Sequence, residues 1–151
     1  MSPFPNSARK GIKMNNYIDP DRERFGQFKD LPREGKIHML NLVKLNDKAV
    51  YEDGTETTGQ EAYAAYSRDS GPIFKGLGGK IVWSGSFQLT FIGPEEEEWD
   101  ICFVAEYPSA EAFISMIRNP DYQKAVKHRQ AAVKTSRLIR TTPREAGSGF
   151  G

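Results

Sequence analysis

Alternation of apolar and polar positions is clearest in residues 80–92, KIVWSGSFQLTFI. Apolar side chains recur at every second position from Ile81 to Phe91, with a gap at Gly85, and serine, glutamine or threonine stands between most of them. A period of two predicts a β-strand over the whole range. Residues 99–107, WDICFVAEY, predict a second strand, and the intervening GPEEEE predicts that the two form a hairpin.

Two shorter apolar segments predict the remaining strands. Residues 36–45, KIHMLNLVKL, are rich in apolar residues and too short for a free-standing helix, so they predict a strand. Residues 136–142, SRLIRTT, predict the last strand. The dipeptide Asp53-Gly54 predicts a turn after the strand at 36–45.

A short N-terminal helix is predicted over residues 20–31. Asp19 is expected to be its N-cap, and Pro20 occupies the first helical position, where its missing N–H costs nothing. Phe25 and Phe28 lie three positions apart and therefore share one face.

The second predicted helix begins at a capping box. Thr58 and Glu61 have the spacing of that motif, and apolar residues follow at helical spacing. Proline cannot donate a backbone hydrogen bond, so Gly71-Pro72 is expected to break or kink this helix. A further helical turn is expected to continue to Gly79.

Two consecutive helices are predicted near the C-terminus. Ser109 is the expected N-cap of the first, SAEAFISMIRN. Asn119-Pro120 is expected to end that helix and to begin the next, over residues 120–134.

The order of these elements is strand, helix, strand, strand, helix, strand, after an N-terminal helix. This order predicts an α+β fold, the ferredoxin-like βαββαβ arrangement, with a four-stranded antiparallel sheet and helices on one face. We expect a single domain over residues 17–142. The flanks lack periodicity, so residues 1–16 are expected to be loosely ordered and residues 143–151 to form a flexible tail.

Both faces of the predicted sheet carry apolar side chains. In the strand at 99–107, Ile101 and Phe103 point to one face, whereas Cys102 and Val104 point to the other. Helices cover one face, and the second face also needs a cover. Packing of sheet against sheet in a homodimer would provide it.

Composition narrows the class of protein. Apolar residues make up 38% of the chain and the net charge is +1, with both signs interspersed, which argues against a nucleic-acid-binding protein. The acidic run Glu95 to Glu98 is expected to be a solvated turn. No apolar stretch is long enough for a membrane span or a secretory signal. The single cysteine, Cys102, is expected to be buried and inert, and these features together predict a cytoplasmic protein.

Five segments resemble one known family: MLNLVKL, GQEAYAAY, GPEEEEWD, VAEYPSAEAF and NPDYQKAVKHRQAA. The chain from about Tyr17 to Thr141 is similar to the domain-of-unknown-function 1330 family, part of the dimeric α/β-barrel superfamily. The resemblance implies that two ferredoxin-like subunits pack sheet to sheet, each with a pocket between its sheet and its helices. The superfamily includes cofactor-free monooxygenases, haem-degrading proteins, dismutases and ligand-binding regulators, and only fold analogy connects those functions to this chain.

Arg129 is the most informative candidate site residue. On a helical projection of residues 120–134, Arg129 falls within the apolar stripe formed by Tyr122, Val126 and Val133. A charge on that face needs a partner or water. We favour a structural role, either paired with Asp100 or Glu106 or extended to the rim. The alternative is an anchor for an anionic ligand.

His128 lies at the edge of the same stripe. Its chemistry suits a general base near neutral pH, although a partly exposed surface histidine is the preferred interpretation. Asn41 interrupts an apolar strand face, where it either satisfies neighbouring backbone groups or points a donor into the pocket. His128, Arg129 and Asn41 form the candidate catalytic set.

The candidate pocket wall consists of aromatic residues: Tyr63, Tyr66, Trp83 and Trp99. Core packing is the default interpretation for each. Two distant histidines without a cysteine cluster make no convincing metal site, and no nucleotide-binding motif appears, so neither metal nor cofactor is predicted. The leading hypothesis is a homodimer that binds a small acidic or aromatic metabolite, with cofactor-free oxygenation or isomerisation as its chemistry if it is an enzyme. The alternatives are a non-catalytic binding or interaction module and a haem-binding protein.

Overall fold

The computed structural model describes residues 16–147 and 149–151. The predicted loosely ordered segment at 1–16 lies outside the described residues except for its last position. The helices are α1 Arg22–Asp30, α2 Gly59–Gly76, α3 Ala110–Arg118 and α4 Pro120–Ala132. The strands are β1 Ile37–Leu45, β2 Lys48–Val50, β3 Glu56–Thr58, β4 Lys80–Gly85, β5 Ile101–Tyr107 and β6 Val133–Thr141.

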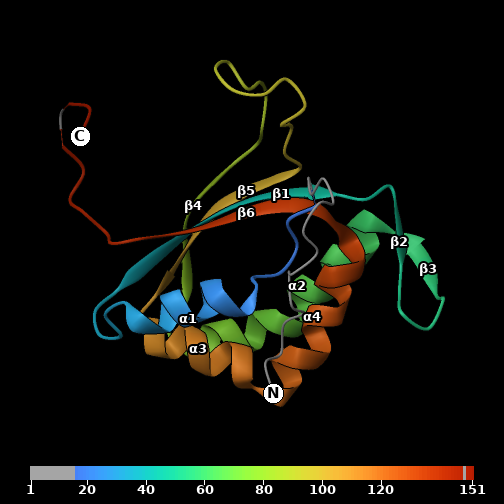
Figure 1. The fold of residues 1–151 in the computed structure, drawn as a ribbon, viewed down its shortest axis with the longest axis horizontal. Coiled ribbons are helices and arrows are strands. Elements are labelled where there is room, and N and C mark those ends of the chain that lie inside the picture. The colour runs from blue at the N-terminus through green and yellow to red at the C-terminus, as the bar shows by residue number, and fades with distance from the viewer. Residues whose placement is uncertain (1–15, 148) are drawn as a thin grey trace.

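Four of the strands form one antiparallel sheet in the order β4-β5-β1-β6. The helices all lie on the same side of this sheet (Figure 1). This topology confirms the predicted ferredoxin-like fold with an added N-terminal helix. The central strand β1 places Asn41 between Phe103 of β5 and Leu138 of β6.

The predicted caps at Thr58 and Ser109, and the predicted helix boundary at Asn119-Pro120, are confirmed. The hydroxyl of Thr58 accepts a hydrogen bond from the backbone N–H of Glu61, and that of Ser109 accepts one from Ala112. The side chain of Asn119 accepts hydrogen bonds from the first turn of α4. Because each cap depends on neighbours in the sequence, local chemistry is sufficient to predict it.

The predicted cap of α1 is wrong. Asp21, and not Asp19, accepts the hydrogen bond from the N–H of Arg24, at 2.7 Å. Asp19 is engaged elsewhere, since its carboxylate accepts a hydrogen bond from the side chain of Gln130. Asp21 offers the same capping chemistry two residues later.

Of the two predicted effects of Gly71-Pro72 on α2, a break or a kink, the break is absent. This helix runs through Pro72 to Gly76 without a break. Ile73 and Phe74, in its last turn, pack against the hydrophobic core, and this packing compensates for the hydrogen bond that proline cannot make. The chain leaves the helix at Gly78, whose φ of 88° favours glycine.

The strand predicted at 80–92 ends at Gly85, where the register pairs it with Cys102 of β5. Beyond Gly85 the chain makes no further strand pairing with β5, which extends only one residue past Cys102, to Ile101. Residues 86–98, which we call the arm, instead project from the sheet on the side away from the helices (Figure 1). The sequence also missed a small hairpin, β2–β3, around the predicted turn at Asp53-Gly54.

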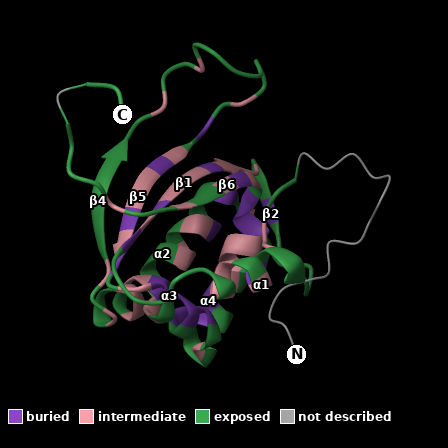
Figure 2. Ribbon diagram, turned by 60° about the vertical axis from the view of Figure 1, so that its left-hand side comes forward, coloured by how far each residue is buried: buried purple, intermediate pink, exposed green. Residues whose placement is uncertain are grey.

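The core lies between the helices and one face of the sheet, the inner face. Ile37 and Met39 of β1 and Ala105 of β5 are buried there, against α3 and α4. The opposite, outer face is less buried, and β4 is exposed along its whole length (Figure 2). The side chains of this outer face include Leu40, Leu42, Trp83, Val104 and Ile139.

Candidate functional site

A cavity of about 1600 Å³ is lined by residues of the sheet and of all four helices, and its lining extends to Ile139 at the outer face. Many aromatic side chains line it, which makes it suitable for an apolar or aromatic molecule. The aromatic residues of the wall are Tyr17, Phe25, Phe28, Tyr63, Tyr66, Phe74, Phe103, Tyr107, Phe113 and Tyr122.

Tyrosine hydroxyls provide polar groups inside this apolar wall. The hydroxyls of Tyr66 and Tyr122 lie 2.8 Å apart and share a hydrogen bond, and the ring of Tyr63 lies 5.5 Å from that of Tyr66. Burial raises the pKa of Tyr63, Tyr107 and Tyr122, because a phenolate would lose its hydration there. These phenols are therefore neutral at physiological pH and can donate or accept hydrogen bonds.

Asn41 lies on the sheet side of the cavity, as the second of its two sequence interpretations required. Its amide nitrogen donates a hydrogen bond to the carbonyl of Met39, at 3.0 Å. The amide of Asn41 thus binds a backbone group of its own strand, which is the first of the two interpretations drawn from the sequence. The side chain reaches the wall while being held in place.

Arg129 also reaches the cavity wall, but protein groups engage its guanidinium. It donates one hydrogen bond to the carbonyl of Ile18 and another to the hydroxyl of Ser136. The carboxylate of Asp19 lies 4.0 Å away. Since the side chains of Arg129 and Asp19 are only 12% and 9% exposed, this is a largely buried charge pair.

The two sequence-predicted partners of Arg129 are wrong. Asp100 accepts a hydrogen bond from the backbone of Leu45, and Glu106 pairs with His38 at 3.0 Å on the outer face. The true partner, Asp19, was read as a helix cap. It lies 110 positions from Arg129 in the sequence, so no local pattern relates the two.

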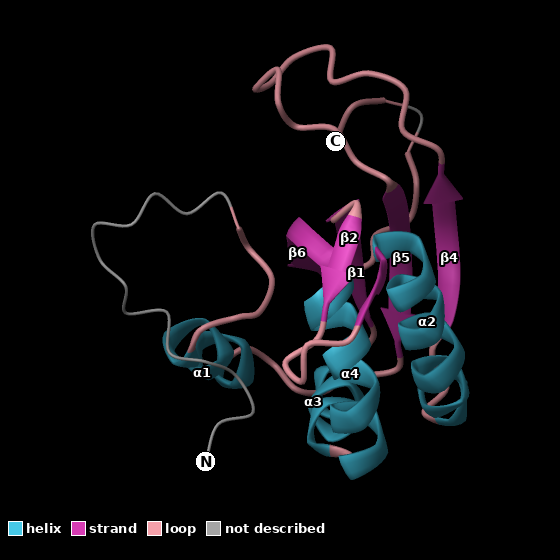
Figure 3. Cartoon of the chain, turned by 90° about the vertical axis from the view of Figure 1, so that its right-hand side faces the viewer, coloured by secondary structure: helices cyan, strands magenta, loops and turns pink. Residues whose placement is uncertain are grey.

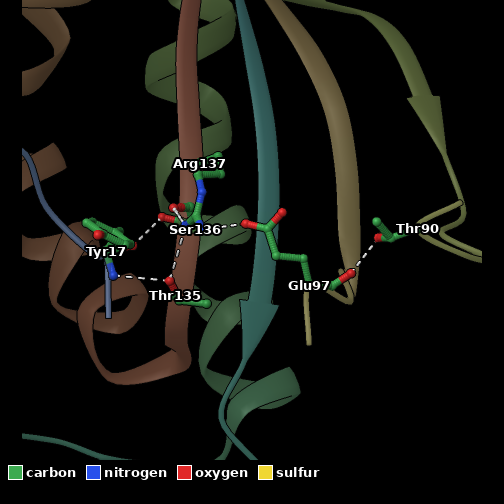
Figure 4. A network of polar contacts seen from close by, with 6 residues as sticks. All are labelled: Tyr17, Thr90, Glu97, Thr135, Ser136 and Arg137. Carbon is green, nitrogen blue, oxygen red and sulfur yellow. Dashed lines mark hydrogen bonds and ion pairs between the residues drawn. The ribbon is translucent and has the colours of Figure 1, made fainter. Parts of the chain in front are cut away.

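Arg129 belongs to a set of contacts that fastens residues 17–19 to the domain. The backbone N–H of Tyr17 donates to Thr135, and the hydroxyl of Ser136 donates to the carbonyl of Tyr17 (Figure 4). Gln130 binds the carboxylate of Asp19, at 3.1 Å. This segment therefore forms part of the cavity wall, and Arg129 holds it there.

Asp19 retains an unsatisfied group. Its Oδ1 atom is buried and has no hydrogen-bond partner within the described part of the chain. Burial raises the pKa of Asp19, while Arg129 and Gln130 act in the opposite direction. The charge pair therefore does not fully compensate for the lost hydration of this carboxylate.

His128 lies apart from the other candidate catalytic residues. Its Nδ1 is 2.6 Å from the hydroxyl of Tyr51, and its Nε2 is 3.4 Å from a carboxylate oxygen of Asp69. Among the described residues, it is not part of the cavity wall. The contacts join the β2–β3 hairpin, α2 and α4, and Tyr51 carried no sequence signal that would have identified it.

The two tryptophans also lie outside the cavity wall as far as the described chain goes. Trp83 is 51% exposed, and its register opposite Val104 places it on the outer face. Trp99 is buried, with the guanidinium of Arg137 located 5.4 Å from its ring. Tyr63 and Tyr66 are the predicted wall residues that do line the cavity.

Further charged side chains that the sequence interpretation had not selected line the cavity. Five are cationic: Arg24, Lys75, Lys80, Arg137 and Arg140. Arg24 of α1 and Lys75 of α2 are among those exposed to solvent. With Arg129, six cations face three carboxylates on this wall, those of Asp19, Asp21 and Asp100. The cavity thus combines many aromatic rings with an excess of positive charge.

Within residues 16–147 and 149–151, no three His, Cys, Asp or Glu side chains are grouped as a metal site would require. No helix in that part of the chain is long and apolar enough to cross a membrane.

A family described as "Domain of unknown function (DUF1330)" matches residues 54–141. Two crystal structures of the RPA0582 protein, a protein of unknown function from Rhodopseudomonas palustris, are similar over nearly their whole length. The methylated form has 61% identity and a TM-score of 0.86, and covers 89% of this chain and 100% of that chain. The second has 60% identity and a TM-score of 0.83, and covers 87% and 99%.

Two further structures match at low identity. A dimeric protein of unknown function from Bacteroides fragilis has 14% identity and a TM-score of 0.45, covering 73% of this chain and 98% of that chain. SnoaB, a cofactor-independent oxygenase from Streptomyces nogalater, has 13% identity and a TM-score of 0.47, covering 76% and 99%. No protein with a curated function matches the chain at a significant level.

Proposed function

Because the chain belongs to the domain-of-unknown-function 1330 family, which carries no activity of its own to transfer, we propose from its cavity that it binds a small aromatic acid. The observation that carries this proposal is the distribution of charge within the cavity. Aromatic rings and neutral phenols make up much of its lining, and six cations, among them the exposed Arg24 and Lys75, outnumber three carboxylates there.

A ligand matching this distribution has an apolar ring and an anionic group at one end. The ring would pack among the aromatic side chains of the interior. The hydroxyls of Tyr66 and Tyr122 would bind a polar substituent on that ring, and the amide of Asn41 offers a further contact. The acid would remain near solvent, where a cation stabilises it without the cost of burying its charge.

We propose that two copies of the chain associate through the outer faces of their sheets. Leu40 and Val104 are partly buried there, and Trp83 and Ile139 are about half exposed. The helices lie on the other side and cannot cover these side chains (Figure 1). A second outer face would cover them and leave both cavities accessible from the helical side.

Binding is better supported than turnover. Cofactor-free oxygenation or isomerisation would need a base at the ligand, and His128 contacts Tyr51 and Asp69 away from the cavity wall. The guanidinium of Arg129, which was considered as an anchor for an anionic ligand, already donates hydrogen bonds to Ile18 and Ser136. Haem ligation by His128 meets the same obstacle, since both of its ring nitrogens face protein groups.

The alternative of a non-catalytic binding or interaction module predicts that Arg129 is paired within the protein and that no cavity reaches it. Arg129 is paired with Ile18, Ser136 and Asp19, as that alternative requires. Arg129 also lines the cavity, which supports a ligand-binding protein.

Ligand-observed NMR with phenylacetate and 4-hydroxyphenylacetate tests the proposal. Cyclohexanecarboxylate and benzyl alcohol are the comparison compounds, because one lacks the aromatic ring and the other the charge. We expect both aromatic acids to bind, and each comparison compound to bind more weakly.

Ser67 offers a variant that blocks the cavity, because it is exposed and belongs to the wall. Ser67→Trp should fill the mouth and abolish binding. Ala64→Trp is the matched control, since Ala64 is exposed on the same helix and is not among the described wall residues. Equal binding by the two variants, or no binding by the wild type, would contradict the proposed function.

A further inference from the structure

The arm, residues 86–98, presents apolar side chains to solvent. Leu89, Phe91 and Ile92 are 72%, 87% and 90% exposed. They follow directly from β4, and residues 86–92 have the alternating pattern of a strand although they pair with none. Exposed apolar residues grouped in this way are typical of an interaction surface.

The arm is held in a defined shape. The hydroxyl of Thr90 donates a hydrogen bond to the carbonyl of Glu97, at 2.6 Å, which closes the arm on itself. A turn at its tip brings the N–H of Glu97 within 3.1 Å of the carbonyl of Pro94. The carboxylate of Glu97 is paired with Arg137 of β6 (Figure 4). These contacts hold the apolar side chains away from their own domain, so the arm is suited to contact another molecule.

The arm and the outer face of the sheet lie on the same side of the domain. Figures 1 and 3 both show the arm leaving the end of β4 away from the helices. On that side, Trp83 and Ile139 are also about half exposed. One chain therefore carries both a projecting apolar element and an uncovered apolar surface.

The exposed area is sufficient for a stable interface. Large apolar and aromatic side chains offer about 150–250 Å² each when fully exposed. Multiplied by the exposed fractions on the arm, on β4 and on the outer face, this gives an exposed apolar area of about 800 Å² per chain. One partner of a standard interface buries a similar area. The residues included are Val82, Trp83, Leu89, Phe91, Ile92 and Ile139.

We propose that the arm of each chain packs across the outer face of a second copy, so that Leu89 and Phe91 cover the partner's sheet. This inference rests on the homodimer proposed above and adds the element that each subunit contributes to the other. A twofold axis makes such a contact self-complementary, because each copy supplies one arm and receives one. It also accounts for the alternating sequence of residues 86–92, which serves intermolecular packing.

Sedimentation equilibrium of the arm variant Leu89→Ser/Phe91→Ser tests the proposal. Both side chains are almost fully exposed in the single chain, so their replacement should not unfold it. We expect the dimer dissociation constant to rise about 100-fold, since two apolar anchors are lost from each subunit. Val50→Ser, at a residue that is 52% exposed on the β2–β3 hairpin, is the control and should leave the constant unchanged.

A photoreactive benzophenone side chain in place of Phe91 tests the contact itself. In a mixture of isotopically light and heavy protein, we expect cross-links between the two labels, to peptides of β1, β4 or β5. A dimer that is unaffected by the arm variant, with cross-links within one label only, would overturn the arm exchange and leave the homodimer intact. A monomeric wild type would overturn the homodimer and the arm exchange, while the aromatic-acid titration would still test the cavity.

Discussion

The guanidinium of Arg129 lies 4.0 Å from the carboxylate of Asp19, where the segment before α1 meets α4. Both side chains are largely buried, and the same guanidinium donates hydrogen bonds to the carbonyl of Ile18 and the hydroxyl of Ser136. Arg129 is therefore an anchor that fastens one wall of the cavity. This role explains why Arg129 lies beside the cavity and why its guanidinium binds groups of the protein itself.

Replacing Arg129 should destabilise the domain. Arg129→Ala leaves the buried Asp19 without its charge partner, and removal of one member of such a pair costs about 3 kcal/mol. Urea denaturation measures the change in the free energy of unfolding. Lys127→Ala, at an exposed position on the same helix, is the control and should change it little. A loss in Arg129→Ala as small as that of the control would show that Arg129 is not an anchor.

Asp19 should make stability depend on pH in a definite direction. Burial raises its pKa above the ordinary 3.8, so the folded state holds the proton more tightly than the unfolded state does. The stability associated with this proton is present below 3.8 and is lost as the pH rises through the folded-state pKa. Asp19→Asn cannot lose a proton, so its stability relative to the wild type should increase over that range. Urea denaturation at acidic and neutral pH measures the stability of Asp19→Asn relative to the wild type. If that relative stability fell with rising pH, attraction to Arg129 would affect the pKa of Asp19 more than burial does.

The Tyr66–Tyr122 hydrogen bond should appear as a coupling energy. Tyr66→Phe and Tyr122→Phe each leave the other buried hydroxyl without this partner, whereas the double variant removes both groups. In a double-mutant cycle, the free energies of unfolding lost in the two single variants are added together. We expect this sum to exceed the loss in the double variant by about 1 kcal/mol. Additive losses would mean that the two hydroxyls do not interact.

His128 should adopt one tautomer when neutral. The hydroxyl of Tyr51 can donate to Nδ1 at 2.6 Å, which leaves the proton on Nε2, facing Asp69. Nitrogen NMR of the imidazole ring should therefore detect the Nε2–H form, and Tyr51→Phe should weaken that preference. A ring protonated at Nδ1 in the wild type would contradict this assignment.

Positive charge on the cavity wall should contribute to ligand affinity. Lys75→Ala should raise the dissociation constant for phenylacetate about fivefold, as expected for one exposed ion pair. Lys124→Ala, an exposed lysine of α4 outside the described wall, should leave it unchanged. Calorimetric titration measures the dissociation constant for phenylacetate in both variants. Equal constants would show that Lys75 does not contribute to binding.

The parts of the fold that sequence predicted depend on near neighbours. The caps at Thr58, Ser109 and Asn119 bind backbone groups two or three residues away, so the sequence contains all the information they need. The alternation in residues 80–92 was equally clear, but a strand in a sheet also needs a neighbouring strand. Residues 80–85 pair with β5, and residues 86–92 do not. Alternation predicts the faces of an extended segment, whereas pairing is a property of the whole fold.

The site depends on contacts that the sequence does not place together. Arg129 was recognised because a charge interrupts an apolar stripe, which is a local signal, but its partner Asp19 is distant in the chain. His128 contacts Tyr51, next to the β2–β3 hairpin, an element that was not predicted. Successive residues of a helix point about 100° apart, so His128 and Arg129 face different surroundings. Tyr63 and Tyr66 lie on successive turns of α2, a spacing that the sequence shows directly, and both line the cavity.

A crystal structure of the protein with its tightest-binding aromatic acid tests the central claim most directly. We predict a ring enclosed between the sheet and α2, a polar substituent at the hydroxyls of Tyr66 and Tyr122, and a carboxylate directed toward Lys75 or Arg24. An acid bound elsewhere on the surface, with the cavity occupied by water alone, would contradict the proposal that this cavity is the binding site.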